Sequence, residues 1–107
     1  MHTAHGKQIQ YASLIETDCD PKVEVIAAET NKSIVITDIF LSAKQNAINA
    51  EIYLYDGATK IFNWFPEYTS SSLNFTGPLH LSAGGAFNVG CDSSATDFSM
   101  LITYYYL

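Results

Sequence analysis

The sequence has 107 residues, which suits a single domain. Hydrophobic residues make up 48% of it and charged residues only 15%, against a typical charged share of about 25%, so part of the outer surface is expected to be apolar or aromatic. The net charge is −6 and arginine is absent. This argues against a nucleic-acid partner and against contact with anionic membranes, because both rely on Lys and Arg.

No apolar run is long enough to span a bilayer, and the polar residues 1–7 lead into no signal-peptide core. We therefore expect the protein to be made in a cytoplasm and not to be secreted by a signal peptide. In such a reducing compartment Cys19 and Cys91 are expected to be free thiols. A structural disulfide between them is the alternative.

The first half of the chain shows short apolar runs with alternation, which is typical of strands. We expect strands over residues 9–15, 22–25 and 33–41. The third is rich in β-branched residues, and Asp38 in its middle predicts a bulge that changes which side chains point inward. Residues 42–51 are interpreted as a loop with room for one helical turn.

The next strand, over residues 50–55, alternates Ala50, Ile52 and Leu54 on one face with Glu51, Tyr53 and Tyr55 on the other. Asp56-Gly57 predicts a hairpin turn into a strand over residues 60–65. Further strands are expected over 73–75, 79–81, 86–91 and from 98 to the C-terminus. Turns at Gly77-Pro78 and at residues 83–85 are expected between them.

Eight or nine short strands without a convincing helix predict an all-β fold, a single antiparallel β-sandwich. The jelly roll is favoured over an immunoglobulin-like sandwich, because Trp64 lies far downstream of Cys19. We expect the sandwich over residues 11–107 and an N-terminal arm over residues 1–10.

No set of residues has the pattern of a catalytic or metal site, so no enzyme activity and no cofactor or metal are expected. A metal centre would need several histidines, but only His80 lies among the strands, while His2 and His5 fall on the arm. Cys91 alternates with buried positions and lacks a nucleophile motif. The pair Asp18 and Asp20 is interpreted as a solvated turn, since calcium needs more oxygen ligands.

Aromatic residues are the most informative surface candidates, with seven Tyr, six Phe and one Trp. Tyr and Trp are enriched at the centres of protein interfaces. The candidate interface residues are Tyr53, Tyr55, Trp64, Tyr104, Tyr105 and Tyr106. A carbohydrate- or receptor-binding module that stacks ligands on Tyr53, Tyr55, Trp64 or Tyr68 is the alternative.

Three segments together resemble small β-sandwich proteins from the structural gene clusters of tailed phages: residues 36–42, 52–57 and 77–89. The resemblance spans about residues 20–107 and rests on strand order and turn residues. It implies a capsid decoration (cement) protein on the virion surface, which binds the major capsid protein as a homotrimer. It implies no catalytic residues. The alternative then becomes a binding module of a tail or head fibre.

Overall fold

The computed structural model describes residues 3–4, 7–15, 19, 22–43, 51–65, 70–92 and 98–107. Strands dominate these ranges, and none of the described residues is helical. The strands are β1 (Thr3–Ala4), β2 (Lys7–Gln8), β3 (Gln10–Ile15), β4 (Val23–Ile26), β5 (Ile34–Ala43), β6 (Ile52–Asp56), β7 (Thr59–Trp64), β8 (Ser70–His80), β9 (Phe87–Cys91) and β10 (Phe98–Tyr106).

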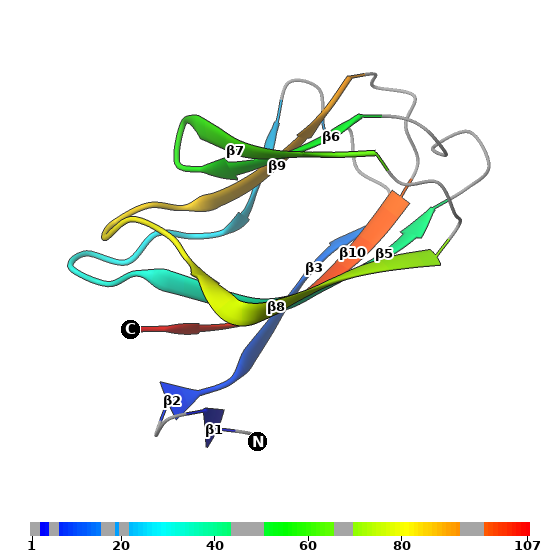
Figure 1. Cartoon of the computed structure of the whole chain (residues 1–107). Coiled ribbons are helices and arrows are strands. Elements are labelled where there is room, and N and C mark those ends of the chain that lie inside the picture. The colour runs from blue at the N-terminus through cyan, green and yellow to red at the C-terminus, as the bar shows by residue number, and fades with distance from the viewer. Residues whose placement is uncertain are drawn as a thin grey trace.

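Two four-stranded antiparallel sheets lie face to face, as Figure 1 shows. One has the strand order β3-β10-β5-β8 and the other β4-β9-β6-β7. The chain crosses repeatedly between the sheets, so that its first and last sandwich strands, β3 and β10, are neighbours. This is the order of a jelly roll, which two interlocked Greek keys produce. The predicted fold class is therefore confirmed.

The predicted bulge in β5 is confirmed. Asp38 pairs with Thr103 of β10 and Ile36 pairs with Tyr104, so Thr37 has no partner in the register. Ile34 and Ile36 point inward before the bulge, whereas Ile39 and Leu41 do so after it. The extra residue thus keeps the apolar side chains on the core side although the spacing changes from even to odd.

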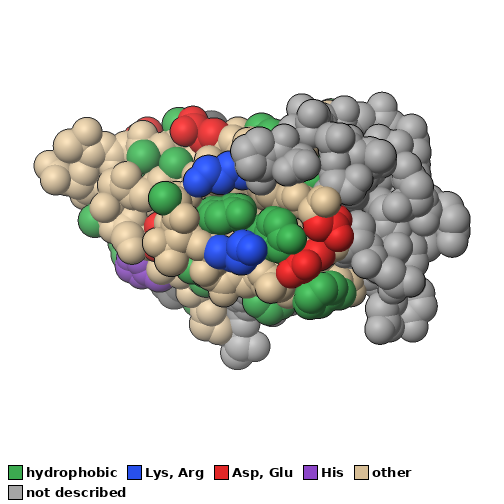
Figure 2. Space-filling view, turned by 90° about the horizontal axis from the view of Figure 1, so that it is seen from above, with side chains coloured by type: hydrophobic (Ala, Val, Ile, Leu, Met, Phe, Trp, Pro, Cys, Tyr) green, Lys and Arg blue, Asp and Glu red, His purple; other side chains and the backbone are tan. Residues whose placement is uncertain are grey.

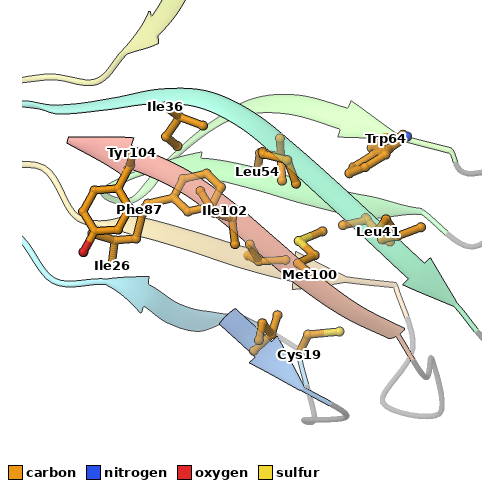
Figure 3. Close-up of a cluster of buried hydrophobic side chains, with 14 of the residues drawn as sticks. Cys19, Ile26, Ile36, Leu41, Leu54, Trp64, Phe87, Met100, Ile102 and Tyr104 are labelled. Carbon is orange, nitrogen blue, oxygen red and sulfur yellow. The ribbon is translucent and has the colours of Figure 1, made fainter. Parts of the chain in front are cut away.

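The core fills the space between the sheets with aliphatic and aromatic side chains (Figure 3). Ile36 and Ile102 come from one sheet, Leu54 and Phe87 from the other, and each is at most 1% exposed. Burial of each such side chain contributes roughly 1.5–3 kcal/mol. The alternation of β6 is confirmed here, because Ile52 and Leu54 are buried while its tyrosines face outward.

Two turns lie side by side at one end of the sandwich. The predicted β6–β7 hairpin turns at Gly57, whose φ of 61° favours glycine. The Asp56 carboxylate accepts hydrogen bonds from the backbone N–H of Ser82 (3.0 Å) and from its hydroxyl (2.8 Å). The turn before β9 passes so close that a Cβ on Gly85 would collide with this carboxylate. Asp56 therefore ties the two turns together.

The prediction of two strands separated by a turn at Gly77-Pro78 is wrong, because both residues lie inside the continuous strand β8. β8 pairs with β5 on either side of them, through Asn74 with Asp38 and through Leu79 with Ile36. Four residues of β8 thus stand opposite Thr37 alone. Proline is tolerated at such an irregularity of an edge strand, where its missing N–H breaks no ladder bond.

Cys19 and Cys91 form a disulfide, which corrects the expectation of two free thiols. Their Cα atoms are 5.4 Å apart, and the Cys91 N–H also donates to the Cys19 carbonyl at 3.1 Å. Both side chains are buried. The bond attaches the connection between β3 and β4 to the end of β9. Sequence separation could not reveal it, because the fold alone brings the two residues together.

The N-terminal residues form a small separate ladder. Thr3 pairs with Gln8 and Ala4 with Lys7, and β2 contacts β10. The sandwich begins at Gln10, beside the boundary expected at residue 11. The expected loop over residues 42–51 falls largely outside the described residues, which stop at residue 43 and resume at residue 51.

Candidate protein interaction surfaces

Tyr53 and Tyr55 lie next to each other on the outer face of the β4-β9-β6-β7 sheet, as their alternation in β6 predicts. Their rings meet edge to face, with centroids 6.4 Å apart and an interplanar angle of 82°. This geometry suits the quadrupoles of two aromatic rings. We call the outer surface around these two residues the tyrosine face.

Lysine side chains lie over both rings of the tyrosine face. The Lys60 amine is 3.7 Å from the centroid of Tyr53, and the Lys22 amine is 4.9 Å from that of Tyr55. Cation–π contacts of this kind contribute about 0.5–1 kcal/mol at exposed sites. Figure 2 looks onto this face, where lysine side chains flank a hydrophobic patch bordered by acidic side chains. The face therefore combines aromatic surface with charges of both signs.

Desolvation and nearby acidic residues change the pKa of the Tyr53 hydroxyl group. Desolvation, followed by the negative charges of Glu51 and Asp92, raises the pKa of Tyr53 above its usual value. A hydrogen bond with the Glu51 side chain contributes in the same direction, because it favours the protonated phenol.

Of the three C-terminal tyrosines, Tyr104 and Tyr105 are only 8% and 6% exposed, which corrects their placement in a surface interface. Tyr104 follows the inward alternation of β10 and its hydroxyl donates to Gln10 Oε1 at 3.1 Å. Tyr106 is partly buried against the core, and its hydroxyl donates to the Ala27 carbonyl at 2.7 Å. Desolvation is the largest cause that raises the pKa of both Tyr104 and Tyr106. The charge of Glu29 follows for Tyr104, whereas for Tyr106 the neighbouring Tyr104 comes second and the acidic residues come after it.

Trp64 also belongs to the interior, with 7% of its surface exposed. It pairs with the buried Ile52 and points to the core side of β7, at one end of the cluster in Figure 3. A stacking platform for sugars therefore cannot use this indole in the folded chain. Tyr68, the fourth residue of that alternative, lies outside the described residues.

Sequence reasoning missed the outer face of the other sheet, β3-β10-β5-β8. Four large apolar side chains there are 44 to 67% exposed: Tyr11, Ile15, Phe40 and Leu101. Leu101 pairs with Phe40 across the strands, and a shallow hollow of ≈ 320 Å³ adjoins both and Ile15. We call this surface the neutral face. The sequence signal for it was Phe40, which alternates with Ile39 and Leu41 and therefore points outward once the bulge turns those two inward.

No group of three or more His, Cys, Asp or Glu side chains gathers among the described residues, and the disulfide occupies Cys91. His2, His5, Asp18 and Asp20 lie outside those ranges. No helix within the described ranges is long and apolar enough to cross a membrane.

A small apolar pocket of ≈ 150 Å³ opens between β7 and β8, lined by Leu54, Ile61, Phe62, Leu73 and Leu79.

Comparison with known proteins adds the fold relationship. No protein-family model and no curated protein sequence matches the chain. A chain from the solved capsid asymmetric unit of cyanophage Pam1 superposes on it with a TM-score of 0.53 and 13% sequence identity. The match covers 98% of this chain and 89% of that one. At this low identity the likeness shows that the two chains share a β-sandwich fold along almost their whole length.

Proposed function

We propose that this chain is a structural protein of a phage virion, which decorates the capsid surface and stabilises the shell by binding the major capsid protein as a homotrimer. The observation that carries the proposal is the superposition on a chain of the cyanophage Pam1 capsid asymmetric unit over 98% of this chain. The match extends over 89% of the capsid chain as well, although fold alone does not define a function.

The proposed role is binding without catalysis. A protein that binds the assembled shell, but not its separated subunits, stabilises the assembly by mass action. The tyrosine face is the surface that we assign to the shell. Tyr53 and Tyr55 are held by the lysines over their rings, and pre-positioned tyrosines are typical of residues that dominate binding energy.

Co-sedimentation with empty shells assembled from the major capsid protein of the same phage tests this function. We expect saturable binding and a higher melting temperature of the decorated shell. The double variant Tyr53→Ala/Tyr55→Ala should weaken binding at least about tenfold, as loss of central interface tyrosines usually does. Leu107→Ala, which removes an exposed apolar side chain just beyond β10 in the other sheet, is the control and should bind normally. Shells that never retain the wild-type protein would refute the proposal.

Light scattering on the purified protein tests the homotrimer separately, since a monomer at every concentration would exclude it. A glycan array addresses the carbohydrate-binding alternative. Specific binding to one sugar class, abolished by the same double variant, would replace the capsid proposal with that alternative.

A further inference from the structure

The neutral face is almost free of charge. Asp38 is the only Asp, Glu, Lys or Arg residue on the four strands of its sheet. The cross-strand rows instead combine apolar and hydroxyl side chains: Ser13, Leu101 and Phe40 in one row, and Ile15, Ser99 and Ser42 in the next. Covering these rows removes no charge from water, and their hydroxyl groups need hydrogen-bond partners in the interface.

The charges of the described residues gather elsewhere. The strands of the opposite sheet carry Glu24, Asp56 and Lys60, and an exposed ion pair joins Glu29 to Lys32 at 3.4 Å in the loop between the sheets. The chain as a whole has a net charge of −6. Two copies that meet through most of their surface would therefore oppose like charges, whereas two neutral faces would not.

We propose that the neutral face is the surface through which this chain contacts a second copy of itself. The charge distribution identifies a second copy as the partner. Among the surfaces that the structure describes, this is the one through which two copies of an acidic chain can meet with the least electrostatic repulsion. The half-exposed side chains of Ile15, Phe40 and Leu101 supply the apolar centre that an interface needs, and the serine hydroxyls around them supply adaptable hydrogen bonds.

This inference rests on the proposed function and deepens it. Around the three-fold axis of a homotrimer the contact is heterologous, so that one part of the neutral face of each copy meets another part of the neutral face of the next copy. The tyrosine face is then left for the shell. The shell is the competing occupant of the neutral face. A variant on the neutral face distinguishes these two occupants. If the face is a subunit contact, the variant lowers the mass of the oligomer in solution, whereas a variant that disturbs only a shell contact leaves that mass unchanged.

Phe40→Glu is the decisive variant, because it places an unpaired carboxylate at the centre of the face. We expect the subunit dissociation constant to rise about 100-fold or more, measured by analytical ultracentrifugation across a concentration series. Phe65→Glu is the matched control: it makes the same change at a ring that is 57% exposed, against 54% for Phe40, and should leave the assembly intact. Ser42→Glu adds a charge to the face without removing an apolar group and should weaken assembly in the same direction.

Circular dichroism and thermal melting establish that each variant is folded, and Ser42→Glu keeps the test valid if Phe40→Glu does not fold. Dissociation by the neutral-face variants, with intact assembly of Phe65→Glu, supports the inference. A wild-type protein that is monomeric overturns it, as does an oligomer that stays intact in both the Phe40→Glu and the Ser42→Glu variant. If such an oligomer loses only shell binding, the neutral face belongs to the shell; the capsid function then survives while the assignment of the subunit contact fails.

Discussion

The Cys19–Cys91 disulfide should contribute a large share of the stability of this domain. The cysteines are separated by 72 residues, and closing a loop of that size restricts the unfolded chain by about 4.4 kcal/mol at 25 °C. Domains of this size unfold with free energies of roughly 5–15 kcal/mol. Reduction of the disulfide should therefore remove between about 30% and 90% of the free energy of unfolding.

The native state should change little when the disulfide is reduced. Both side chains are at most 2% exposed, and buried thiols pack as small apolar groups. The hydrogen bond from the Cys91 N–H to the Cys19 carbonyl does not depend on the sulfurs. The loss of stability consequently comes from the greater freedom of the unfolded chain, so that the reduced protein is expected to fold, but weakly.

Urea unfolding with and without a phosphine reductant measures this difference by linear extrapolation. We expect a loss of about 4 kcal/mol, which corresponds to a fall of roughly 20 °C in melting temperature for a chain of this length. The variant Cys19→Ala/Cys91→Ala is the control, and it should unfold near the reduced protein and ignore the reductant. A loss below about 1 kcal/mol on complete reduction, verified by thiol titration, would refute the loop-closure reasoning.

Three further predictions concern the turns and the C-terminal strand. Gly85→Ala should cost about 1–3 kcal/mol in urea unfolding, because the new Cβ collides with the Asp56 carboxylate; an unchanged midpoint would contradict the tight approach of the two turns. Tyr106→Phe removes the hydrogen bond to the Ala27 carbonyl and should cost about 1 kcal/mol in the same assay, whereas a neutral effect would mean that water replaces it. The raised pKa values of Tyr104 and Tyr106 mean that the folded state holds these two protons more tightly than the unfolded state does. The contribution of these groups to the free energy of unfolding should therefore be constant below about pH 10 and fall as the pH rises further. Tyrosinate absorbance should appear at higher pH in the native protein than in urea, and coincident titrations would contradict this.

The two outer faces of the sandwich differ in composition, which fits two different kinds of binding contact. One sheet presents ordered tyrosines with charges of both signs, and the other presents apolar and hydroxyl groups with a single acidic residue, Asp38. The decoration role that we propose needs contacts of two kinds, to other copies of the chain and to the shell. Separate surfaces allow each contact to change in evolution without disturbing the other.

The sequence by itself determined the strands, because alternation and turn residues act over a few positions. It located the bulge near Asp38, the hairpin at Gly57 and the outward direction of Tyr53 and Tyr55, all of which the structure reproduces. It also predicted the jelly roll from the number of strands. Gly77-Pro78 was misread, because the tolerance of an edge strand for proline depends on its partner.

Only the tertiary structure decided which side chains of a strand are covered and which distant residues meet. Alternation assigns a side chain to one of two faces, but it does not say that Trp64 and Tyr104 point into the core or that Tyr105 is covered on the outer face of its sheet. Nor does it place Cys19 beside Cys91, since the chain between them passes through both sheets before they meet. The neutral face arises in the same way: β3, β5 and β10 are far apart in sequence, and only their pairing gathers Ile15, Phe40 and Leu101 on one surface.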